Sequence, residues 1–156
     1  MLAHLIRTGD LLLDWDARPA LTLAGLCHGV YGTDGFPTAL RSLQHRPEIA
    51  ALVGVEAEAI VYRYASCDRR FTFPRLGREG PVAFRDRFTG QVIVTNPFCL
   101  SDFVELTFAN ELDLVSHSPA FGAKDGAAIA DVLGRCTHYV SPPARRAFHL
   151  ILGCYQ

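Results

Sequence analysis

The chain has 156 residues, of which 49% are hydrophobic, so it can form one domain with a real core and is not a disordered segment. Its 15 basic and 16 acidic residues give a formal net charge of -1. Nucleic-acid binding usually needs a basic face, so this balance argues against a nucleic-acid partner. We predict a single domain over residues 1–156.

No apolar run approaches the roughly 20 residues that are needed to cross a bilayer, so no membrane partner is expected. Residues 1–7 lack the basic and apolar regions of a signal peptide. The expectation that follows is a cytoplasmic protein.

The cysteines are odd in number, and no two of them form a CxxC pair. They are Cys27, Cys67, Cys99, Cys136 and Cys154. This pattern argues against both a disulfide framework and a cysteine-type zinc site. Free cysteine behaves as a small apolar side chain, so most of these thiols are expected in the interior.

Apolar residues recur at helical spacing through the first half of the chain. The predicted helices there cover residues 2–15, 19–31, 38–44 and 47–67. Pro19 suits the first turn of its helix because it needs no N–H there, and Gly32 provides a natural end. Gly54 is expected to bend or split the last of these helices.

The middle of the chain changes character, because residues 71–81 are rich in Gly, Pro and Arg and are expected to be irregular. Residues 82–87 and 91–95 read as two strands of a hairpin. The remaining predicted helices cover residues 102–115, 125–139 and 141–152, with Asp102 and Asp125 as the caps of the first two. The predicted fold is mainly α, a helical bundle with one small β-hairpin.

Two histidines fall on the predicted inner faces of the first two helices. His4 shares a face with Thr8, and His28 shares one with Ala24. Antiparallel helices joined by a short turn can oppose such imidazoles, which bind Fe, Zn, Ni and Mn well. A metal centre needs at least a third ligand, and the nearest carboxylate is that of Asp34 in the turn. The alternative is that both histidines are hydrogen-bonded, partly buried side chains.

Four segments carry a pattern that resembles a known superfamily. They are His4–Trp15, Leu23–Phe36, Ala57–Arg69 and Glu105–Asp113. The most specific run is Ala-Gly-Leu-Cys-His-Gly-Val-Tyr-Gly-Thr-Asp-Gly-Phe, within the second segment. Together they resemble the HD (histidine–aspartate) superfamily, and within it a group of small bacterial HD-like proteins. The resemblance implies an HD-like helical bundle with a metal in its core, used for phosphoester hydrolysis or for oxygenation.

By position, His4 matches the first histidine of the superfamily and His28 the histidine of the His-Asp doublet. Gly29 stands where the aspartate of the doublet is expected, and Asn110 where the last aspartate is expected. Both anionic ligands are therefore missing. Asp34, or Asp113 on the same helical face as Asn110, is positioned to compensate.

The candidate site follows from these correspondences. The expected metal ligands are His4, His28 and Asp34, holding Fe, Mn or Ni, with His28 and Asp34 also as the catalytic pair. The residues expected to bind a small-molecule substrate are Tyr31, Thr33, Asp68, Arg69 and Asn110. For the turn residues and the Asp68–Arg69 pair, local hydrogen bonds and a helix-end ion pair are the alternatives.

Three functions compete at this point. The first, which we take as the leading hypothesis, is a metal-assisted HD-like hydrolase or oxygenase acting on a small molecule, and the histidine pair and the acidic turn favour it. The second is a non-catalytic HD-like module that has lost the metal and binds a ligand or a protein, which the missing carboxylates favour. The third possibility is a homodimer assembled through the hairpin.

Overall fold

The computed structural model describes residues 1–155, without the side chain of residue 154, and consists mainly of α-helices. The helices are α1 (Leu2–Asp14), α2 (Pro19–Cys27), α3 (Arg46–Val53), α4 (Val55–Ser66), α5 (Arg69–Thr72), α6 (Pro97–His117), α7 (Pro119–Arg135) and α8 (Pro142–Leu152). Strands β1 (Ala83–Arg85) and β2 (Val92–Val94) form an antiparallel pair in which Phe84 lies opposite Ile93. The predicted mainly α fold with one small hairpin is confirmed.

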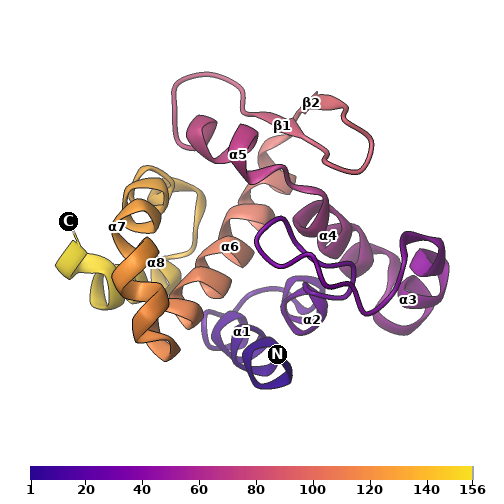
Figure 1. The fold of residues 1–156 in the computed structure, drawn as a ribbon, viewed down its shortest axis with the longest axis horizontal. Coiled ribbons are helices and arrows are strands. Elements are labelled where there is room, and N and C mark those ends of the chain that lie inside the picture. The colour runs from indigo at the N-terminus through magenta and orange to yellow at the C-terminus, as the bar shows by residue number, and fades with distance from the viewer. Residues whose placement is uncertain (156) are drawn as a thin grey trace.

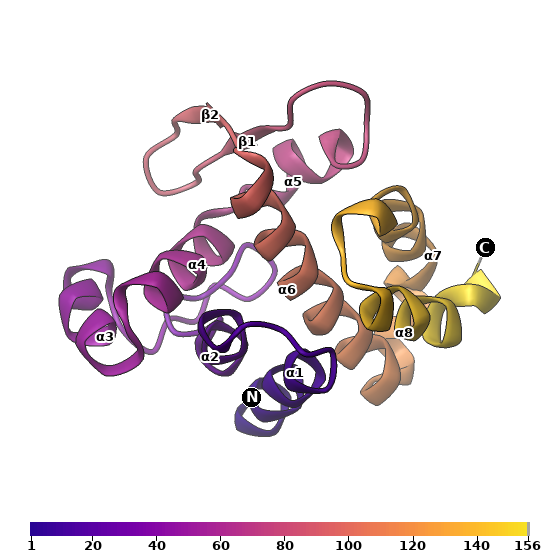
Figure 2. The ribbon, with the colours of Figure 1, turned by 180° about the vertical axis from the view of Figure 1, so that it is seen from behind.

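The long helix α6 runs through the centre of the molecule (Figures 1 and 2). Helices α1, α2 and α4 lie on one side of it, and α7 and α8 lie on the other. The hairpin and α5 sit at the end of the molecule where α6 begins. Because α6 has neighbours on most sides, the side chains of Leu106, Phe108 and Leu112 are fully buried, as its apolar pattern predicts.

None of the helices within residues 1–155 is long and apolar enough to cross a membrane. Cys67 and Cys136 are buried, Cys27 and Cys99 are partly buried, and these four thiols are free. The side chain of Cys154 lies outside the described part of the structure.

Several predicted boundaries in the first half are wrong. Helix α2 ends at Cys27 rather than near residue 31, because residues 28–32 form tight turns in which Gly32 N–H donates to the Gly29 carbonyl. Residues 38–42 are not helical; the amides of Leu40 and Arg41 donate instead to one carbonyl in the preceding turn. A short 3-10 turn follows at Leu43–His45. The split at Gly54 is confirmed, with a φ of 92°.

Two predicted caps in the second half are also wrong. Helix α6 starts at Pro97, where Asn96 accepts a hydrogen bond from the Cys99 amide, so Asp102 lies inside the helix. Helix α7 starts at Pro119, capped by Ser118, so Asp125 also lies inside a helix. The glycines of α7 do not break it but permit close packing, since a Cβ on Gly126 would lie 2.7 Å from the ring of Tyr155.

Two glycines set the distance between α1 and α2. A Cβ on Gly25 of α2 would lie 3.2 Å from Gly9 Cα and 2.6 Å from a methyl of Leu12, both in α1. This close approach brings together the two helices that carry His4 and His28.

We expect Gly25→Ala to lower the free energy of unfolding by about 1 kcal/mol, because overpacking costs about 1–3 kcal/mol and helix propensity returns up to about 1 kcal/mol. Gly29→Ala is the matched control, since its Cβ would meet only a Leu5 methyl at 3.5 Å. Chemical denaturation of both variants measures the difference. Equal stability of the two would show that the α1–α2 contact has room for a methyl group.

Candidate polar network between the helices

Two imidazoles meet in the interior between α1 and α2. The ring centroids of His4 and His28 lie 5.1 Å apart, and the rings are nearly perpendicular at 89°. His28 is 3% exposed and packs edge-on against Tyr64 at 5.4 Å on its other side. The structure therefore brings the two predicted histidines together, His4 from α1 and His28 from the C-terminal cap of α2.

Both ring nitrogens of His4 face residues of α6. Its Nδ1 lies 2.6 Å from Asp113 Oδ2, and its Nε2 lies 3.1 Å from Asn110 Oδ1. Asp113 is buried, and Arg7 also reaches it, with Nε 2.6 Å from Oδ1 and Nη2 2.9 Å from Oδ2. Burial disfavours the charge of Asp113, yet the hydrogen bonds from Arg7 and His4 hold its pKa below the usual value.

The Asn110 amide is oriented by its neighbour Glu111. Asn110 Nδ2 donates to Glu111 Oε1 at 3.1 Å, and because a carboxylate only accepts, Oδ1 must be the atom that faces His4. Both partners of the His4 ring are then acceptors. Both nitrogens of His4 are therefore engaged by side chains of α6, and neither is free to face the interior.

Arg69 closes the network on the side of α4 and α5. Its Nη1 donates to Glu111 Oε1 at 2.7 Å, and its Nη2 donates to the hydroxyl of Tyr64 at 2.9 Å. Glu111 is 1% exposed, so its charge is compensated almost entirely by Arg69 and the Asn110 amide. Burial raises the pKa of Tyr64, which keeps this phenol neutral. We refer to Arg7, His4, Asp113, Asn110, Glu111, Arg69 and Tyr64 as the internal network.

His28 borders the internal network as a neutral ring. Its Nδ1 donates to the Gly25 carbonyl at 2.7 Å. Burial lowers the pKa of His28 to about 4, and the nearby positive charges of His4 and Arg69 act in the same direction. The hydrogen bonds to Gly25 and Asn110 only partly oppose this shift.

Asp34 does not face the two histidines. It is exposed, and its Oδ2 accepts a hydrogen bond from the Arg69 backbone N–H at 2.8 Å. Among the side chains that the structure describes, which exclude those of residues 154 and 156, no three from His, Cys, Asp or Glu are grouped in a way that could hold a metal ion. The predicted set of His4, His28 and Asp34 is therefore not assembled as three ligands, and the residues present do not fit a metal centre.

The other predicted site residues serve mainly local contacts. Thr33 Oγ1 accepts from the Phe36 amide within the turn. Asp68 caps α5 by accepting from the Phe71 amide, and its Oδ2 lies 3.4 Å from Arg85. The alternative interpretation of these residues, as turn and helix-end contacts, agrees with these hydrogen bonds.

Tyr31 belongs to a second buried cluster, beside α4. It donates to Glu58 Oε1 at 2.9 Å, and Arg46 binds the same carboxylate with Nε at 2.6 Å and Nη2 at 2.9 Å. Burial and the hydrogen bond to Glu58 raise the pKa of Tyr31 above its usual value. The Tyr31 hydroxyl therefore binds a buried carboxylate inside the protein and does not face a pocket.

Sequence reasoning missed three members of the internal network. Glu111 adjoins Asn110 and Tyr64 lies five residues before Arg69, but neither has a spacing that points to the histidines. Arg7 lies one turn after His4, so an arginine–carboxylate pair with Asp113 could have been suspected from helical spacing.

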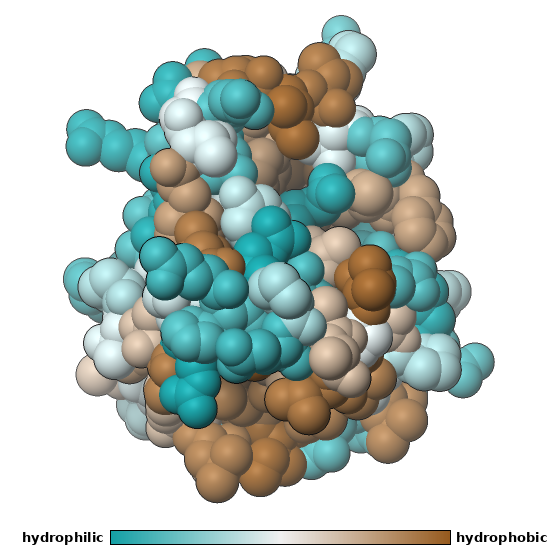
Figure 3. All heavy atoms as spheres, turned by 90° about the vertical axis from the view of Figure 1, so that its right-hand side faces the viewer, coloured by the Kyte–Doolittle hydropathy of each residue, from teal (hydrophilic) through white to brown (hydrophobic). Residues whose placement is uncertain are grey.

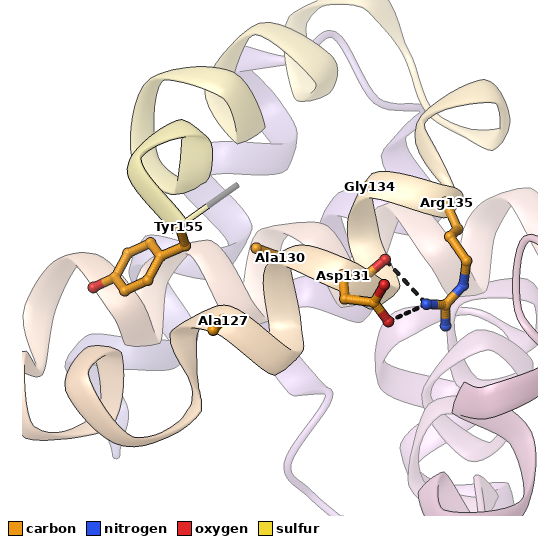
Figure 4. Close-up of a pocket in the computed structure, with 6 residues that line it drawn as sticks. All are labelled: Ala127, Ala130, Asp131, Gly134, Arg135 and Tyr155. Atoms are coloured by element: carbon orange, nitrogen blue, oxygen red, sulfur yellow. Dashed lines mark hydrogen bonds and ion pairs between the residues drawn. The ribbon is translucent and has the colours of Figure 1, made fainter.

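His28 does not line any of five cavities found among the described residues. The one that touches the internal network has a volume of about 200 Å³ and includes Arg7, Asp113 and His117 in its wall. A cavity of about 430 Å³ lies on α7 (Figure 4). In that view Asp131 and Arg135 are paired with each other, and the ring of Tyr155 extends away from Ala130. None of the residues predicted for the site lines it.

The fold and the network define a mainly helical protein with a closed, charged interior between α1, α4, α5 and α6. Residues 1–69 match a family model described as a domain of unknown function (DUF6817). This stretch carries both histidines, Asp34 and Arg69, whereas the α6 half of the network lies beyond it. No curated protein matches the chain, and no solved structure does.

Proposed function

We propose that this chain is a non-catalytic, HD-like helical module that has lost the metal site and acts by binding a ligand or a protein partner at its surface. The observation that carries the proposal is the hydrogen bonding of His4, whose two ring nitrogens lie 2.6 Å from Asp113 Oδ2 and 3.1 Å from Asn110 Oδ1, both on α6. Coordination of a metal ion needs a ring nitrogen with a free lone pair, so His4 would first have to give up one of these two hydrogen bonds.

The charges of the internal network support the same proposal. The two carboxylates that could neutralise a divalent cation, Asp113 and Glu111, are paired with Arg7 and Arg69 instead. Arginine cannot be deprotonated in a protein, so these positive charges stay in place at any physiological pH. The guanidinium groups thus supply the charge compensation that an ion would otherwise provide.

The competing function is a metal-assisted hydrolase or oxygenase acting on a small molecule, located in the cytoplasm in either case. The approach of His4 and His28 to 5.1 Å favours it. It requires His4 to release Asp113 or Asn110 and a third ligand to move in. Cavities of about 200–470 Å³ leave room for a small ligand on the surface under both functions.

Elemental analysis of the protein purified without a chelator distinguishes the two. We expect far less than one Fe, Mn or Ni per chain, and a Tm that neither EDTA nor added Mn²⁺ or Ni²⁺ changes, because no preformed site exists to couple metal binding to folding. Near-stoichiometric metal that disappears in both His4→Ala and His28→Ala would contradict the proposal. His45→Ala, in a partly buried histidine outside the network, is the matched control for adventitious binding.

A further inference from the structure

The hairpin has one protected edge and one open edge. Along the outer edge of β1, the Arg85 carbonyl accepts from the Asp68 amide at 3.0 Å, and the Arg87 amide donates to the Ser66 carbonyl at 2.7 Å. The segment before α5 therefore covers β1. The sheet that the structure describes contains only these two strands, so β2 presents its other edge to solvent.

The register shows which backbone groups are open. Thr95 N–H donates to the Val82 carbonyl and Asp86 N–H to the Gln91 carbonyl, so the residues of β2 that bond to β1 are 91, 93 and 95. In an antiparallel pair, the backbone N–H and C=O groups of the residues between these positions point away from the neighbouring strand. The N–H and C=O groups of Val92 and Val94 consequently point outward from the sheet.

The open edge is apolar and uncharged. Val92, Ile93 and Val94 are 52%, 46% and 69% exposed, although β-branched apolar residues usually pack against something. The space-filling view shows apolar surface at the top of the molecule, where Figure 1 places the hairpin (Figure 3). A cavity of about 470 Å³ adjoins this edge and is walled by Val82, Val94 and Leu100, among others.

One buried hydroxyl also lacks a partner at this edge. Thr95 Oγ1 is the buried side-chain polar atom without a hydrogen bond among the described residues. Such atoms are rare in native proteins and call for an explanation.

We propose that β2 pairs antiparallel with β2 of a second copy of this chain, across a two-fold axis at Ile93. This register places Val92 opposite Val94 of the other copy, so the outward groups of both strands form four N–H···O=C bonds. The strand from Gln91 to Thr95 carries no charge, so the symmetric pairing opposes no like charges. The same register sets Gln91 of one copy opposite Thr95 of the other.

This inference names a partner for the interaction role in the proposed function, but its test does not depend on metal content. Light scattering coupled to size exclusion is expected to give twice the chain mass of 17.1 kDa for the unmodified protein. Val94→Pro removes one outward N–H without removing a bond to β1, so we expect it to be monomeric with an unchanged circular dichroism spectrum. Val94→Ala keeps that N–H and is the matched control, which is expected to stay dimeric.

Hydrogen exchange reports the pairing directly, and it serves if Val94→Pro fails to fold. In the dimer the amides of Val92 and Val94 are expected to be protected. In Val94→Lys the two added charges would lie diagonally across the two-fold axis and repel each other, so we expect a monomer in which the Val92 amide exchanges rapidly and the Ile93 amide stays protected by β1. A monomer at every concentration would overturn the proposal. The alternative would then be that an extended peptide of another protein pairs with β2. A dimer with unprotected Val92 and Val94 amides would overturn it as well.

Discussion

Replacing Arg69 by Met is expected to lower the free energy of unfolding by about 3–5 kcal/mol, the range found when one partner of a buried ion pair is removed. Glu111 would be left with a buried charge and only the Asn110 amide as its partner. The Tyr64 hydroxyl would lose its acceptor-side contact with the guanidinium at the same time. Urea denaturation at neutral pH measures the loss.

A double-mutant cycle with Glu111→Gln assigns that loss to the ion pair. The neutral amide needs no cation, so Arg69→Met should cost much less in the Glu111→Gln background. Arg70→Met is the matched control, because Arg70 is exposed and follows directly in α5; it should change the stability by less than about 0.5 kcal/mol. Equal effects of the two arginine substitutions would show that the internal network contributes nothing to stability.

The second large effect is a loss of stability in mild acid that originates at His28. Its pKa is about 4 in the folded protein against a reference of 6.5, so between these values the unfolded chain binds a proton that the folded chain does not. The free energy of unfolding should therefore be constant above about pH 7 and fall as the pH is lowered from 6.5 to 4. The total loss is about 3 kcal/mol, since each pKa unit corresponds to about 1.4 kcal/mol.

Denaturation curves at several pH values, compared with those of His28→Gln, isolate this contribution. The variant should lack the decline between pH 6.5 and 4, while the pH dependence of all other groups stays in both proteins. Asp113 does not interfere with the comparison, because its pKa is lowered in the folded protein and the residue is the same in both proteins. An NMR titration that finds His28 protonating near pH 6.5 would refute the expected burial of a neutral ring.

Much of the fold could be predicted from patterns of residues that are close together in the sequence. The positions of α1 and α8, the split at Gly54 and the hairpin are set by apolar spacing, glycine and turn chemistry, all visible in the sequence. The errors arise where two caps compete. Asp102 and Asp125 resemble caps, but Asn96 and Ser118, each followed by a proline in the first turn, begin their helices earlier.

The candidate site was predictable only in its local part. Helical faces predicted that His4 and His28 share the interior, because each lies on an apolar stripe of a neighbouring helix. Nothing local indicates that Glu111 meets Arg69 across 42 positions, or that Asn110 is turned by its own neighbour. Those contacts depend on how α4, α5 and α6 pack, which no periodicity encodes.

The covered edge of β1 determines how far assembly can proceed. If β2 pairs with β2 of a second copy, neither chain has another open strand edge, because residues 66–68 already bond to the outer edge of β1 in each hairpin. In the dimer that we propose, propagation into a filament would thereby be blocked, and the exposed Val-Ile-Val stretch, which would otherwise invite aggregation, would be limited to a closed, two-chain particle.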